Sequence, residues 1–66
     1  MTLKEIMGLS HGNWVVLRDG REGRFQEVHE YHRKDNEPFV IVNLPNKDDP
    51  YSHNEWLWPA QIKRRR

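Results

Sequence analysis

The chain has 66 residues, 35% of them hydrophobic, which leaves room for one small domain and excludes a large catalytic fold. It contains no cysteine, which excludes disulfides and thiolate zinc sites and indicates a reducing, cytoplasmic location. Of the 11 basic residues four lie at 63–66, so the first 62 residues carry seven basic and ten acidic side chains. The formal charge of +1 therefore divides into a body of −3 and an end of +4. No apolar run reaches the roughly 20 residues of a membrane span, so we expect no membrane contact.

The first residues predict a short helix. Thr2 and Glu5 have the spacing of a capping box, in which each side chain bonds to the other residue's backbone N–H. Three apolar residues at i, i+3 and i+4 form one face: Leu3, Ile6 and Met7. Gly8 can end the helix in the left-handed conformation. We expect residues 1–9 to form a short helix packed on the rest of the chain.

Residues 10–62 predict about five short strands separated by turn signals. Asp19-Gly20 marks the first turn, and Gly23 indicates a bulge or a close approach of two backbones. Residues 59–61, which begin with a proline, indicate a single helical turn. The expected strands are residues 14–17, 25–31, 39–42, 51–58 and a short closing strand at Ile62.

The segment from Phe39 to Val42 is apolar at every position, so both faces of this strand need a cover. A homodimer through this strand is one way to cover it, and the amino-terminal helix is the other. We expect the core to include Val15 or Val16 together with Leu17, Phe25, Val28, Val40, Val42 and Leu57.

Two stretches of the chain, 14–28 and 55–62, follow a known pattern. The first is an apolar strand and a turn followed by Gly20, Gly23, Phe25 and Val28. It resembles the opening hairpin of Src-homology-3-like (SH3-like) small barrels of the KOW- and Tudor-like group, and the second resembles their last strand, helical turn and closing strand. The resemblance implies an all-β, five-stranded SH3-like barrel with a short amino-terminal helix. Such barrels bind nucleic acids, ribosomal partners, modified peptides or other proteins.

Three arginines recur at every third residue around the first turn: Arg18, Arg21 and Arg24. Arginine pairs with phosphate through two hydrogen bonds and stacks on bases, so the three could meet nucleic acid on one rim of the barrel. The resemblance supports this, because that loop of KOW-like barrels often contacts nucleic acid. Asp19 and Glu22 lie between the arginines, and the simpler interpretation is a solvated turn with weak local ion pairs, each below about 1 kcal/mol.

The last four residues form a run of cations: Lys63, Arg64, Arg65 and Arg66. We expect residues 63–66 to be a flexible tail that contacts several phosphates, with an affinity that falls steeply as salt rises. The simpler interpretation is a solubilising terminus. Together with the arginines around the turn, this run supplies the candidate binding cations.

Trp56 and Trp58 lie on one side of a strand and Leu57 on the other. If Leu57 belongs to the core, both tryptophans face outward and can stack on bases or anchor a partner protein. In the opposite register both tryptophans belong to the core. The sequence leaves these two registers open.

We expect no metal, no cofactor and no enzymatic activity. His29 and His32 could share a metal with His11 or His53, but residues three apart on a strand lie on opposite faces. The chain therefore predicts a non-enzymatic binding module that contacts nucleic acid or a ribonucleoprotein through its arginines, tryptophans and basic tail. The alternative is a protein-interaction or inhibitor module of phage or plasmid type that binds a host protein.

Overall fold

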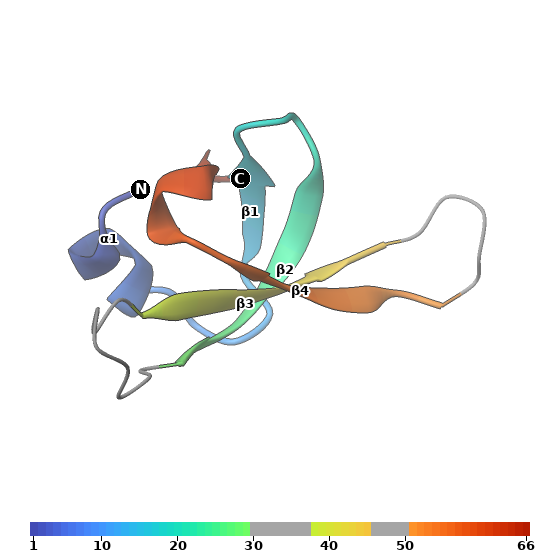
Figure 1. The fold of residues 1–66 in the computed structure, drawn as a ribbon, viewed down its shortest axis with the longest axis horizontal. Coiled ribbons are helices and arrows are strands. Elements are labelled where there is room, and N and C mark those ends of the chain that lie inside the picture. The colour runs from blue at the N-terminus through green and yellow to red at the C-terminus, as the bar shows by residue number, and fades with distance from the viewer. Residues whose placement is uncertain (30–37, 46–50) are drawn as a thin grey trace.

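Five antiparallel strands form one sheet in the computed structural model, which describes residues 1–29, 38–45 and 51–66 (Figure 1). The strands follow the order β4-β3-β2-β1-β5, so every pair of neighbours except β1 and β5 is adjacent in sequence. In chain order the elements are α1 (Leu3–Met7), β1 (Trp14–Leu17), β2 (Glu22–His29), β3 (Phe39–Leu44), β4 (His53–Leu57), the 3-10 turn η1 (Pro59–Gln61) and β5 (Ile62–Arg65). The end of the expected second strand, residues 30–31, and His32 lie outside the described residues.

The fold is mainly β, as expected, but its sheet is open. Strands β4 and β5 form its two edges, and within the described ranges they do not pair with each other. The turn η1 joins them and directs Leu57, at the end of β4, and Ile62, at the start of β5, into the same core. The sheet therefore packs around one core without the closure that a complete barrel requires.

Helix α1 begins with the predicted capping box. The Thr2 hydroxyl accepts a hydrogen bond from the Glu5 N–H at 3.3 Å, and the Glu5 carboxylate accepts one from the Thr2 N–H at 3.0 Å. Only Ile6 of the expected apolar face is buried, because a five-residue helix directs one side chain squarely into the sheet. The predicted left-handed Gly8 is wrong: its φ of −83° is right-handed, since its N–H still donates to the last helical turn. No helix in the described ranges is long and apolar enough to span a membrane.

The core lies between α1 and the sheet, and it contains most of the residues that were expected there. Val28 is only partly buried, and Leu44 and Ile62 join the core although they were not named for it, as does Ile6 from the expected apolar face of the helix. The buried cluster consists of Ile6, Val15, Leu17, Phe25, Val40, Val42, Leu44, Leu57 and Ile62. Of the expected alternatives Val15 and Val16, the first faces this cluster and the second is buried on the other side of the sheet.

Gly23 marks the predicted close approach of two backbones. A Cβ atom at this position would lie 2.6 Å from Val42 Cγ1 and 2.7 Å from the Asn43 carbonyl oxygen. These distances are too short for any side chain, so glycine lets β2 lie directly against β3. The bulge itself falls further along β2, where the register shifts between Phe25 and Glu27.

Strand β3 is covered on both faces, as its composition predicts. Val40 and Val42 face the core, while Ile41 is buried on the outer face of the sheet. Strand β3 pairs with β2 on one side and with β4 on the other, so its backbone has no open edge. A homodimer through Phe39 to Val42 would therefore have to use the outer face of the sheet, and it stays a prediction.

The expected flexible tail is a strand for most of its length. Strand β5 runs antiparallel to β1 with Val15 opposite Arg65 and Val16 opposite Arg64, and the Arg66 N–H donates to the Trp14 carbonyl oxygen at 3.0 Å. The correction has a simple cause: pairing with β5 satisfies the hydrogen-bonding groups along the second side of β1. Charged side chains are typical of such an edge strand.

Candidate nucleic-acid interface

Arg18 connects the turn after β1 to the turn before β5. Its backbone N–H donates to the Gln61 carbonyl oxygen at 2.9 Å, and its side-chain Nε donates to the Ala60 carbonyl oxygen at 2.6 Å. No described carboxylate forms an ion pair with this guanidinium. The Nε bond fixes the plane of the guanidinium and leaves its two terminal nitrogens for an external acceptor.

A groove between α1 and β5 gathers four of the predicted binding cations: Arg18, Lys63, Arg64 and Arg65. The groove has a volume of about 760 Å³, and we call it the basic groove. Residues of and around α1, together with Ala60, complete its lining. Glu5 is the one acidic residue in that lining, and the Thr2 N–H bonded to its carboxylate lowers the pKa of Glu5. The groove therefore carries a clear excess of positive charge.

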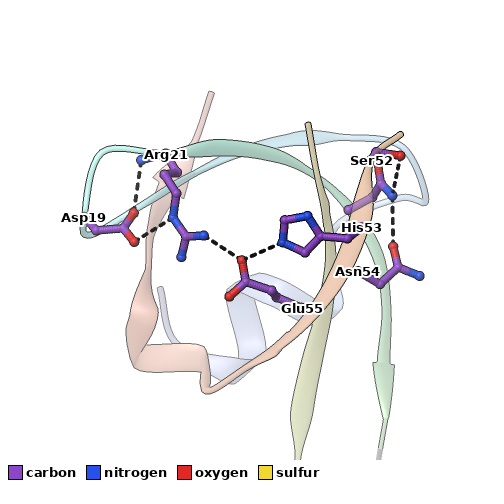
Figure 2. Close-up of polar contacts among 7 residues, drawn as sticks. Asp19, Arg21, Ser52, His53, Asn54 and Glu55 are labelled. Carbon is purple, nitrogen blue, oxygen red and sulfur yellow. Dashed lines mark hydrogen bonds and ion pairs between the residues drawn. The ribbon is translucent and has the colours of Figure 1, made fainter. Parts of the chain in front are cut away.

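Arg21 does not join the basic groove but is held in an ion-pair network (Figure 2). Its Nε contacts Asp19 Oδ2 at 2.8 Å, and its Nη1 contacts Glu55 Oε2 at 2.6 Å. His53 Nε2 lies 3.2 Å from the same Glu55 oxygen. Hydrogen bonds from Arg21 lower the pKa of Glu55 and that of Asp19, where the backbone N–H of Arg21 has the largest effect. The charge of Arg21 is thus already compensated by two carboxylates.

Arg24 and Arg66 both contact Trp14. The guanidinium carbon of each lies 5.0 Å from the centre of the Trp14 ring, within the range of a cation–π interaction. Arg66 Nε also lies 3.4 Å from Glu22 Oε2. Neither arginine lines the basic groove. The structure therefore does not assemble Arg18, Arg21 and Arg24 on one rim, because each has a different partner.

The tryptophans follow the first of the two registers. Leu57 is buried in the core, whereas Trp56 is 53% exposed and Trp58 is 39% exposed. The Phe39 ring lies 5.7 Å from the Trp56 ring and 4.6 Å from the Trp58 ring, and the His29 ring lies 5.4 Å from Trp56. We call these four side chains the aromatic surface: His29 on β2, Phe39 on β3, Trp56 on β4 and Trp58, which directly follows β4.

The turn η1 links the aromatic surface to the basic groove. Trp58 directly precedes η1, and its backbone N–H donates to Gln61 Oε1 at 2.7 Å across this turn. Ala60, in the middle of η1, lines the basic groove and accepts the hydrogen bond from Arg18. A single residue, Pro59, thus separates an exposed indole from the nearest groove residue on the same strand connection.

Sequence reasoning missed the contributions of Phe39 and Ala60. Phe39 is outward-facing in a strand whose alternate residues form the core, and an aromatic residue at such a position was the available signal. Ala60 acts through its backbone carbonyl, for which the amino-acid type offers no signal.

Within residues 1–29, 38–45 and 51–66, no three histidine, aspartate or glutamate side chains gather in a way that could hold a metal ion. Comparison with protein-family models, curated protein sequences and solved structures finds no match to this chain. The functional argument therefore depends on the arrangement of the basic groove and the aromatic surface.

Proposed function

We propose that this protein is a small, non-enzymatic SH3-like binding module that holds the phosphate backbone of a nucleic acid in the basic groove. The observation that carries the proposal is the position of Arg18. This residue is distant in sequence from β5, yet it lines the same groove as Lys63, Arg64 and Arg65. The SH3-like assignment is supported by the strand order, with β5 beside β1, and by the 3-10 turn between β4 and β5.

The charge distribution supports a local contact. The first 62 residues have an excess of three acidic side chains and the whole chain has a net charge of only +1, so the overall charge supplies little attraction for a polyanion. Attraction must come from a place where cations outnumber carboxylates, and the basic groove has four cations to one carboxylate. Phosphate contacts release counterions, so the affinity should fall as salt rises.

Fluorescence anisotropy with short labelled oligonucleotides at several salt concentrations tests the proposal. Arg18→Gln should reduce the slope of log affinity against log salt by about 0.7 to 0.9, the value of one phosphate contact. Arg24→Gln is the matched control, because it removes the same charge from a side chain that contacts Trp14 outside the groove. Its effect on the slope should be clearly smaller.

Two results would contradict the proposal. One is an absence of binding to any oligonucleotide at low salt. The other is an equal loss of affinity and slope in Arg18→Gln and Arg24→Gln, which would indicate diffuse attraction without a groove. Recovery of one stoichiometric protein partner after nuclease treatment, combined with no oligonucleotide binding, would favour the alternative of a protein-interaction module.

A further inference from the structure

We propose that the nucleic acid bound by this protein is single-stranded, with unpaired bases on Trp56 and Trp58 and the adjoining phosphates in the basic groove. The inference rests on the proposed function for its phosphate contacts. It adds the strand class, which the basic groove alone does not determine. The argument comes from the aromatic surface and from its position relative to η1.

The exposed rings suit flat, unpaired bases. The planes of Trp56 and Phe39 meet at 54°, and those of Trp58 and Phe39 at 36°, while 53% of Trp56 and 39% of Trp58 stay exposed to a ligand. Ile41, buried on the outer face, lies directly opposite Trp56 across the β3–β4 ladder. The Trp56 indole thus projects from a packed strand pair, where stacking a base costs little ordering of the backbone.

A duplex could not use these rings. Its bases stack on each other and present only their edges in the grooves, so it would gain only the phosphate contacts. A duplex is also wider than a single strand, and it would extend its second row of phosphates over a body with excess negative charge. A single strand offers free base faces, which aromatic side chains bind with little dependence on sequence.

The path from rings to groove is short and continuous. Trp58 precedes η1, Ala60 in η1 lines the basic groove, and Arg18 is bonded to that residue. In the proposed path the strand passes over η1, with its bases on the aromatic surface and its phosphates in the basic groove.

The test compares one labelled single strand with its duplex in the anisotropy experiment. The protein should bind the single strand at least about tenfold more tightly at low salt, because each stacked base contributes roughly a factor of ten. Trp56→Leu and Trp58→Leu should each weaken single-strand binding about tenfold and leave the salt slope and the duplex affinity unchanged. Trp56→Phe and Trp58→Phe keep an aromatic face and should recover much of the affinity, which separates stacking from a folding defect. Tyr51→Leu removes an exposed aromatic residue outside the aromatic surface and should have little effect.

The outcomes distinguish this inference from the proposed function. Equal affinity for single strand and duplex, or Leu variants that bind as the unmodified protein does, would overturn the inference. If Arg18→Gln still reduced the salt slope in that case, phosphate binding in the groove would stand. An absence of binding to both forms would overturn the two proposals together.

Discussion

The Nε of Arg18 donates a hydrogen bond of 2.6 Å to the carbonyl oxygen of Ala60, across 42 residues of sequence. This bond joins the turn between β1 and β2 to the turn between β4 and β5. It places an arginine at the end of a groove whose other cations come from β5. The position of Arg18 is therefore a consequence of how two distant turns meet.

Arg18→Lys should separate the charge of this side chain from its geometry. Lysine keeps the positive charge, so the salt slope of oligonucleotide binding should stay close to that of the unmodified protein. It lacks the planar group that bonds Ala60 and a phosphate at once, so affinity should fall about fivefold, equivalent to roughly 1 kcal/mol for one hydrogen bond. Anisotropy titrations of both proteins measure the two quantities. Unchanged affinity in the lysine variant would show that the guanidinium has no geometric role.

The Arg21–Glu55 ion pair should make the stability of the protein depend on pH. The pKa of Glu55 is lowered in the folded state, first by its hydrogen bond with Arg21. Such a carboxylate stabilises the fold above its unfolded pKa of about 4.3, and this contribution is lost as the pH falls through the folded pKa. The free energy of unfolding should therefore fall below about pH 5, and less steeply in Glu55→Gln. Urea denaturation across this range measures it.

Glu27→Gln is the control for the pH experiment. Glu27 is an exposed carboxylate on β2 for which no ion pair is formed within the described residues. Its replacement should leave the pH dependence unchanged. Identical curves for Glu55→Gln and the unmodified protein would show that the Arg21 contact does not stabilise the folded state.

Gly23→Ala should destabilise the sheet. The added methyl group would overlap Val42 and the Asn43 backbone, and strands β2 and β3 would have to separate to admit it. Overpacking of this kind costs about 1–3 kcal/mol, which chemical denaturation can detect. Gly8→Ala is the matched control, because Gly8 has right-handed dihedrals and should change stability by less than about 1 kcal/mol. Equal effects of the two substitutions would argue against the close approach at Gly23.

The end of the chain should divide into two functional parts. Arg64 lines the basic groove, whereas Arg66 contacts Trp14 and Glu22. Arg64→Gln should reduce the salt slope of oligonucleotide binding by about 0.7 to 0.9, and Arg66→Gln by much less. Arg66→Gln should instead change the fluorescence of Trp14, which loses one of its two cations. A larger loss of binding in Arg66→Gln than in Arg64→Gln would show that Arg66 belongs to the nucleic-acid interface.

Several parts of the fold could be predicted because local contacts determine them. The capping box of Thr2 and Glu5 spans four residues, and the turn at Asp19 and Gly20 needs only the positive φ of 93° that glycine readily adopts. Val40 and Val42, expected in the core from the fully apolar stretch Phe39 to Val42, are confirmed there. The sequence could not decide which face of the strand carries Trp56 and Trp58. In both possible registers Leu57 lies on the opposite face from the tryptophans, and only the packed structure shows that the Leu57 face meets the core.

By itself, the sequence determined a small, mainly β domain, its turns, most of its core residues and a cationic end. Only the tertiary structure decided that this end forms β5, that Arg18 joins it in one groove, and that Arg21 is held by Glu55 instead. A run of cations carries no local signal for a strand. It becomes one because β1 has a second side of N–H and carbonyl groups that need partners. The even charge balance of the whole chain thus conceals a cationic groove that exists only when distant segments pair.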